Sequence, residues 1–461
     1  MSEINSQETP SKKLSLLDST MIIIGSMVGS GIFIVSADIA RKVGSPGMLL
    51  LVWIVTGVIT IFAALSYGEL AAMMPKAGGQ YIYLKEAYNP MFGFLYGWTF
   101  FSIIQTGTIA AVAVAFAKFT GVFFDFISNK PLLVIGFLSV SVQQLLAISS
   151  IIVLTLLNFK DVKTGALVQN IFTFAKIAAL LLLIALGLII GYNGIGNRNN
   201  FSTEFPDLLS LGTISIFSAA MVGSLFSSDA WNNITFTAGE VKNPQKNLPL
   251  SLVLGTGTVT ILYILANIAY IYVLPIQQIK TAESDRVGTL LMETILGNSG
   301  KFFMAIMIMI STFGCLNGLI LSGGRVYYAM ANDKLFFQQA KKLNKNNVPA
   351  NALIFQCIWA CLLTLSGSYG QLLDYIIFSV LLFYILTVIG IFILRKKQPN
   401  APRPYKAFGY PIIPAIYIVV ATIISISLIT NETTQRGSLF GLGIVLLGLP
   451  IYFIFRKKES I

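Results

Sequence analysis

Long apolar runs, separated by short polar loops, follow one another along the whole chain. About twelve runs reach or approach the roughly 20 residues that a helix needs to cross about 30 Å of hydrocarbon. They lack the alternating ten-residue pattern of barrel strands, so the pattern predicts an all-α integral membrane protein. The approximate bounds of the runs are 20–35, 48–74, 92–116, 142–158, 164–190, 208–237, 250–273, 302–330, 351–365, 372–394, 412–429 and 439–455.

The composition is consistent with a chain dissolved in lipid. Of 461 residues, 55% are hydrophobic and 11% are charged, against roughly 25% charged in a soluble domain. Residues 1–19 are polar and show no cleavable signal-peptide pattern, so we expect the first apolar run to remain as a membrane anchor. We therefore expect a single transmembrane domain over residues 1–461, with the lipid bilayer as its main partner.

The net charge of +12 is distributed by side of the membrane. With the amino terminus inside, 20 of the 31 lysines and arginines fall on the inner side, 8 fall in outer loops and 3 lie within or at the edges of runs. An excess of cations marks the cytoplasmic side. We expect a multi-pass protein with both termini in the cytoplasm, and no nucleic-acid partner.

Residues that carry covalent or metal chemistry are scarce. Histidine is absent, which excludes a histidine base and the usual histidine-containing zinc sites. Cys315, Cys357 and Cys361 lie inside apolar runs, where we interpret them as small buried side chains rather than partners in a loop disulfide. Acids within the runs are few and the loops are too short for a catalytic domain, so we expect neither an enzyme nor a cofactor.

The first run contains three glycines and two serines between Gly25 and Gly31. One interpretation is a small-residue face for tight helix packing, since Gly25 and Gly29 are four residues apart as in a GxxxG motif. The other is a discontinuous helix, because each glycine weakens a helix by about 1 kcal/mol relative to alanine. Unwinding near Gly29–Gly31 would expose main-chain amides and carbonyls, which a membrane tolerates only around a cavity.

The sixth run contains a second polar stretch, over residues 224–233. If the chain consists of two five-helix halves of opposite orientation, runs one and six are equivalent, and paired breaks of this kind indicate a transporter's binding site. Helix amino ends attract anions and helix carboxyl ends attract cations. The pair of breaks therefore favours a zwitterion, such as an amino acid, over a sugar or a lipid.

Several segments, taken in order, resemble one family. Nearly from end to end, the chain resembles the amino acid, polyamine and organocation (APC) superfamily, most closely its L-type amino acid transporter (LAT) branch with bacterial relatives. The segments that carry the resemblance are Gly29-Ser30-Gly31-Ile32-Phe33, Ser66-Tyr67-Gly68-Glu69-Leu70, residues 74–79 with Tyr81, residues 86–88, 94–98, 172–176, Trp231 with 239–244 and 247–249, and Asn317-Gly318 with 322–325.

The resemblance implies the LeuT-like fold. In that fold ten core helices form two inverted repeats, here at about 16–191 and 206–394, and helices one and six are discontinuous. A further helix pair would occupy about 411–455. It also implies that the main-chain amides of Gly29, Ser30 and Gly31 hold the substrate carboxylate, with the Ser30 hydroxyl as an added donor.

The resemblance assigns the other end of the substrate to the sixth helix and the end of the first. The amino group would be held by main-chain carbonyls of Met27, Phe226 and Asp229, and Phe226 would close over the substrate; without the family, Phe226 is simply a core aromatic. Asp229 departs from the glycine of many LAT members, and it either accepts backbone N–H bonds in the break or senses a substrate amine or a proton. Ser227 and Ser228 replace larger neighbours of some relatives, and Ser227 is a further candidate contact.

Lys176 lies about twelve residues from one end of its run and about fourteen from the other. A charge at mid-span costs about 2.5–3.5 kcal/mol on insertion scales, so we expect Lys176 to face the interior and to have a partner. The alternatives are a lysine that reaches the interface and a purely structural lysine. The resemblance places it against the unwound first helix, where sodium sits in related carriers, which implies sodium-independent exchange with Lys176 as a conformational switch.

In eukaryotic LAT proteins a cysteine in the loop between the third and fourth spans joins a heavy subunit. Residues 117–144 contain no cysteine, so we expect no disulfide-linked heavy subunit and a location in a bacterial inner membrane. The function that we expect is exchange of neutral L-amino acids by alternating access. Proton-coupled uptake, carriage of cationic amino acids and a nutrient receptor that no longer transports remain open.

Overall fold

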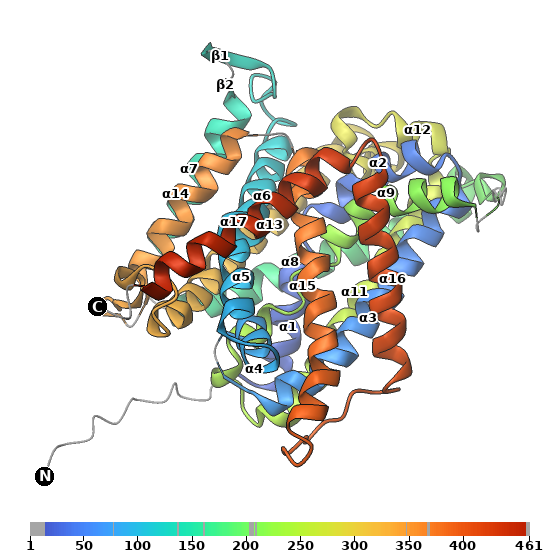
Figure 1. Ribbon diagram of the computed structural model, residues 1–461. Coiled ribbons are helices and arrows are strands. Elements are labelled where there is room, and N and C mark those ends of the chain that lie inside the picture. The colour runs from blue at the N-terminus through green and yellow to red at the C-terminus, as the bar shows by residue number, and fades with distance from the viewer. Residues whose placement is uncertain are drawn as a thin grey trace, which may run out of the picture.

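The structure is a computed structural model that describes residues 14–76, 78–135, 138–159, 162–201, 207, 210–346, 348–366 and 369–457. Several predicted features lie outside these residues. They are the inner-side cations Lys12, Lys13, Lys160 and Lys458, Ala77 of one family segment, residue 206 at the start of the second predicted repeat, and residues 208–209 at the start of the sixth predicted run. The described chain is almost entirely helical (Figure 1).

Eight helices within the described residues are long and apolar enough to cross a membrane, and a bent pair forms a ninth span. The bent pair is α1 (Leu16–Met27) with α2 (Gly31–Val43). The eight are α3 (Pro46–Met73), the run of α5 (Pro90–Thr99), η1 (Phe100–Ile104) and α6 (Gln105–Thr120), α8 (Val162–Ile190), α11 (Pro244–Val273), α13 (Val287–Asn332), α15 (Tyr369–Lys397), α16 (Ile412–Thr430) and α17 (Gln435–Lys457).

Shorter elements complete the described chain. Three are apolar helices of 16 or 17 residues, α7 (Val142–Leu157), α9 (Leu211–Ser227) and α14 (Ala350–Ser366). The others are α4 (Gln80–Ala87), α10 (Asn233–Phe236), α12 (Ile276–Lys280), η2 (Gly191–Ile195), η3 (Arg198–Phe201), η4 (Ala238–Glu240), η5 (Glu283–Asp285) and η6 (Gln338–Lys341).

The prediction of an all-α fold did not include one small antiparallel hairpin. Strands β1 (Pro131–Ile135) and β2 (Leu138–Ser141) pair between α6 and α7, with Ile135 opposite Leu138. The segment is too short to form a membrane helix, and its β-branched and leucine residues suit a strand. The hairpin stands at one end of the molecule, while α4 and the loop between α15 and α16 lie at the opposite end (Figure 1).

Helix ends follow local signals in the sequence. Ser15 and Asp18 form a capping box at the start of α1, and Ser141 and Gln144 form another at the start of α7. Asn89 accepts hydrogen bonds from the first amides of α5, whose first residue is a proline. Polar residues at the run boundaries thus define where several spans begin.

The spans pack in two groups. In one group α3 packs along α11, α1 packs on α11, and α2 packs on α9. In the other, α6 contacts α7, α13 and α14, and α7 lies beside α14 (Figure 1). Helices α9 and α10 are the two halves of a second interrupted span. The second half of the first span, α2, contacts α9, whereas the first half, α1, contacts α10. The two broken spans therefore run antiparallel beside each other.

Candidate functional site

The first span is discontinuous at the place where the glycines lie. Helix α1 ends at Met27, residues 28–30 are not helical, α2 begins at Gly31, and the two halves are bent by 43°. This geometry matches the discontinuous-helix interpretation. Small residues also allow close packing here, because a Cβ on Gly31 would overlap the Ser227 side chain of α9 and one on Gly29 would lie 3.3 Å from the Cys315 sulfur.

Carbonyl groups at the end of α1 are held by side chains. The last carbonyls of a helix have no partner within it, so a buried helix end needs other donors. Three helices supply four donors to four successive residues. The hydrogen bonds are Lys176 Nζ to Gly25 O at 2.7 Å, Cys315 Sγ to Ser26 O at 3.4 Å, Tyr263 Oη to Met27 O at 2.9 Å and Ser311 Oγ to Val28 O at 3.3 Å.

Amide groups on the other side of the break lack such partners. Within the described residues, the backbone N–H groups of Gly29 and Ser30 donate no hydrogen bond. Gly31 opens α2, where the first N–H groups have no acceptor within the helix. Three successive amides therefore stand at the positive end of α2, an arrangement suited to an anion such as a carboxylate.

The sixth span is also interrupted. Helix α9 ends at Ser227, and α10 begins six residues later in the chain, at Asn233. Between them the Asp229 N–H donates to the Phe226 carbonyl at 3.2 Å, and Ala230 has a φ of 65°. A left-handed conformation is unfavourable for a residue with a Cβ, and such backbone strain concentrates at functional sites.

Tyr263 of α11 connects the two breaks. Its hydroxyl lies 2.9 Å from the Met27 carbonyl and 3.1 Å from the Ser227 carbonyl, the last residues of α1 and α9. Both helix carboxyl ends, each with partial negative charge, thus converge on one buried hydroxyl. The place where they converge can also receive the ammonium group of a substrate.

Phe226 and Ser30 meet at Tyr369, the first residue of α15. The Phe226 and Tyr369 rings pack edge to face with centroids 6.1 Å apart, and the Ser30 and Tyr369 hydroxyls are 3.3 Å apart. All three side chains are buried. The two predicted contact residues are therefore brought together by a residue from a third span.

Asp229 faces a different set of groups. The Tyr384 hydroxyl of α15 donates to its Oδ1 at 2.6 Å. Two cavities of about 20 Å³ each are lined in part by Asp229 and Tyr384. A cavity holds one water from about 10–15 Å³ upward, so each has room for about one water.

Lys176 lies where the sequence places it. Its side chain is fully buried, and the Gly25 carbonyl is its partner. Within the described residues no carboxylate lies within 4.0 Å of its ammonium group. The amine of Lys176 therefore lies against the carboxyl end of α1 and away from solvent.

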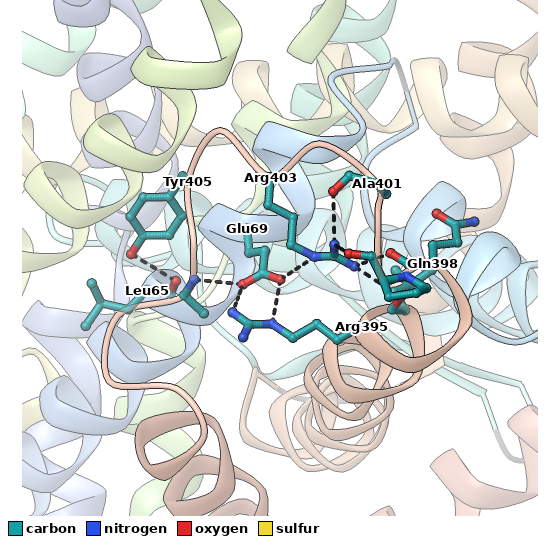
Figure 2. A network of polar contacts seen from close by, with 10 residues as sticks. Leu65, Glu69, Arg395, Gln398, Ala401, Arg403 and Tyr405 are labelled. Carbon is teal, nitrogen blue, oxygen red and sulfur yellow. Dashed lines mark hydrogen bonds and ion pairs between the residues drawn. The ribbon is translucent and has the colours of Figure 1, made fainter.

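A buried ion cluster (Figure 2) lies around the loop between α15 and α16, which is at the end of the molecule opposite the hairpin (Figure 1). Glu69 of α3 is 1% exposed and accepts two hydrogen bonds from Arg395 of α15, at 2.9 and 2.6 Å. Arg403 lies 3.3 Å away, and the Ala407 N–H donates at 2.7 Å. The cluster joins α3 to the end of α15 and to the loop that precedes α16.

Sequence reasoning did not find the three tyrosines of the site, Tyr263, Tyr369 and Tyr384. A signal existed for two of them, since Tyr263 and Tyr384 lie inside predicted apolar runs and a buried tyrosine hydroxyl usually needs a partner. The sequence could not indicate which partner each hydroxyl takes.

The chain is similar in sequence to known membrane transport proteins. The profile of the family described as amino acid permease matches residues 14–449. The chain is 31% identical over 446 residues to the b(0,+)-type amino acid transporter 1 of Mus musculus, an alignment that covers 96% of this chain and 88% of that transporter. It is 32% identical over 449 residues to the large neutral amino acids transporter small subunit 2 of Mus musculus and of Homo sapiens, covering 96% of this chain and 81% and 80% of those proteins.

Proposed function

The chain belongs to the amino acid permease family and transports amino acids across a membrane, and we propose that it does so by alternating access at the paired helix breaks. The observation that carries this proposal is the juxtaposition of three unpartnered amides at the start of α2 with two helix carboxyl ends that converge on Tyr263. One small zwitterion matches both halves of this arrangement.

The substrate carboxylate would lie against the amides of Gly29, Ser30 and Gly31. Its ammonium group would lie against the carbonyls of Met27 and of the sixth span at Phe226 and Asp229. Support comes from the dipoles of the helix ends, each worth about 0.3–2 kcal/mol toward a charge of the right sign. Ser227 contributes through its contact with Gly31, which fixes the distance between the two breaks.

Transport requires the protein to open, because the two cavities beside Asp229, at about 20 Å³ each, are too small for an amino acid. Phe226, packed against Tyr369, acts as the gate that closes over the substrate. The two packed groups supply the moving parts: α1, α2, α3, α9 and α11 rock against α6, α7, α13 and α14.

We propose sodium-independent exchange of neutral L-amino acids. The Lys176 ammonium supplies a fixed positive charge at the end of α1, where a coupling cation would otherwise be needed, and it switches between the two states of the broken helix. The neutral substrate class agrees with the printed name of the large neutral amino acids transporter relatives.

Counterflow in proteoliposomes tests the exchange mechanism. Vesicles loaded with unlabelled alanine or serine should take up labelled substrate, and efflux should depend on external amino acid. Replacement of sodium by choline should leave the rate unchanged. Efflux that is equally fast without external amino acid would show that exchange is wrong.

A second candidate is carriage of cationic amino acids or coupling to protons, and Asp229 favours it. This carboxylate lies in the break with Tyr384 as a donor and cavities beside it. If arginine or lysine competes as well as alanine for counterflow, the cationic class is correct. If a pH gradient alone drives accumulation, symport replaces exchange, and binding of alanine without any flux would indicate a receptor.

The finer architecture is also part of the proposal. The short apolar helices α7, α9 and α14 bring the spans to twelve, with the LeuT-like repeats at about 16–191 and 206–394 and an extra pair at about 411–455. The antiparallel contact of the two broken spans supports inverted repeats. Both termini are proposed to lie on the cytoplasmic side of an inner membrane, and the excess of cations on that side supports this orientation.

The transporter is proposed to act without a disulfide-linked heavy subunit. Two relatives carry the name small subunit, but residues 117–144 of this chain contain no cysteine. Purification from native membranes tests the point, since a single-span protein that copurifies in equal amounts and is needed for flux would contradict it.

A further inference from the structure

An apolar groove of about 520 Å³ opens between α6, α8 and α13, away from the substrate site. Its walls are formed by five phenylalanines, by three apolar side chains of α13 and by Thr120. The phenylalanines are Phe116, Phe123, Phe124, Phe172 and Phe313, and the α13 side chains are Ile306, Met309 and Ile310. The Thr120 hydroxyl donates to the Phe116 carbonyl at 2.9 Å, so it is already satisfied within α6. The volume falls within the roughly 300–1,000 Å³ typical of sites for small molecules.

Phe302 extends the apolar strip of the groove beyond its lining residues, to about the length of one membrane leaflet. At its mouth the ring of Phe302 packs on Phe123 with centroids 5.5 Å apart, and at its floor Phe313 packs on Phe116 and Phe172 at 5.5 and 6.1 Å. Eleven residues of α13 separate Phe302 from Phe313, which is about 16 Å at 1.5 Å per residue. This is about half of the roughly 30 Å hydrocarbon thickness, so the groove accommodates a lipid tail.

Charged groups around Lys301, the residue before Phe302, fit a zwitterionic headgroup. The Lys301 ammonium lies 3.7 Å from Glu293 and 3.9 Å from Glu283. One cation flanked by two acids would repel a purely anionic headgroup. A headgroup with both a phosphate and a primary amine satisfies the cation and one acid together.

We propose that this groove binds one molecule of phosphatidylethanolamine, with an acyl chain along the phenylalanines, the phosphate on Lys301 and the amine on Glu293. The site lies behind the first helix break. Phe172 packs against Gly314 and is four residues from Lys176, while Phe313 is two residues from Cys315. A bound tail thereby supports the contact of α8 with α13, the two helices that hold the Gly25 and Ser26 carbonyls.

Native mass spectrometry of the purified full-length protein, titrated with phosphatidylethanolamine or phosphatidylglycerol, tests the site. Wild-type protein should bind the first molecule of phosphatidylethanolamine more tightly than the molecules that bind after it. Ile310→Trp fills the groove and should weaken this step about tenfold, the cost of about two methylene groups. Ile261→Trp, at an exposed position of α11, is the matched control and should leave it unchanged.

The headgroup is tested without altering the groove. Lys301→Gln should weaken phosphatidylethanolamine binding about fivefold, the contribution of one surface cation. Equal weakening by Ile261→Trp and Ile310→Trp would show exchangeable annular lipid only and would overturn the site. Equal binding of the two phospholipids, or displacement by cholesterol hemisuccinate regardless of Lys301, would overturn the assignment of the headgroup. These measurements require no flux, so their failure is distinguishable from failure of the exchange proposal.

Discussion

Replacing Lys176 with methionine tests how the first break is held. The ammonium is fully buried and lies 2.7 Å from the Gly25 carbonyl, an end carbonyl of α1. Methionine keeps an unbranched side chain of similar length and removes the charge and the donor. The Gly25 carbonyl then loses its partner while the surrounding packing is retained.

The energies of this change oppose each other. A hydrogen bond from a charged donor contributes about 1.5–3 kcal/mol, whereas a charge at the centre of a span costs about 2.5–3.5 kcal/mol. We therefore expect the free energy of unfolding to change by about 1 kcal/mol or less. The equilibrium between the two transport states should change more. The state in which Lys176 donates to the Gly25 carbonyl loses about 1–3 kcal/mol when that carbonyl has no partner. That corresponds to a change of about fivefold or more in exchange rate or substrate affinity.

Thermal unfolding in detergent and alanine counterflow in proteoliposomes measure the two quantities separately. Lys246→Met, at an exposed position in the first turn of α11, is a matched control and should alter neither. If Lys176→Met folds normally and its counterflow kinetics equal those of the wild type, Lys176 is not the switch. If it fails to fold, the lysine is structural.

Three further substitutions have distinct expected outcomes. Ser30→Leu places a bulky side chain beside the amides of the first break and should abolish the thermal shift produced by alanine; a retained shift would move the carboxylate site elsewhere. Tyr263→Phe removes the hydroxyl shared by both helix ends and should lower the free energy of unfolding by about 0.6–1.7 kcal/mol, with an unchanged midpoint counting against the bridge. Glu69→Gln leaves two arginines without their carboxylate and should cost about 3–5 kcal/mol in unfolding experiments. Glu240→Gln, which loses a more exposed pair with Arg325, should cost about 1 kcal/mol or less and serves as its comparison.

Membrane helices and the positions of the breaks could be predicted because both depend on local composition. A run of about 20 apolar residues has few alternatives to a helix in lipid, since its backbone must satisfy its own hydrogen bonds. Glycines and serines between Gly25 and Gly31 weaken that helix wherever it lies. The described bend after Met27 follows from them.

Two other local features, a π-helical turn and the hairpin, could not be predicted from the sequence. The π-helical turn at Phe100–Ile104 lies inside a predicted apolar run, and the indole of the distant Trp359 donates to its Ser102 carbonyl at 2.7 Å. The hairpin at Pro131–Ser141 lies in a loop where no periodic pattern was present. In both places the decisive partner is distant in the chain or absent from the pattern.

The sequence by itself determined that the chain lies in lipid, that it is helical and where two helices are interrupted. Hydropathy and glycine content decide these features because their effect is local, within a few helical turns. Only the tertiary structure decided which donors meet which carbonyls. Tyr263 lies 236 residues from Met27 and 36 from Ser227, yet its hydroxyl reaches both. Such contacts depend on the relative placement of whole helices, and that placement results from the sum of many weak packing interactions which no single segment encodes.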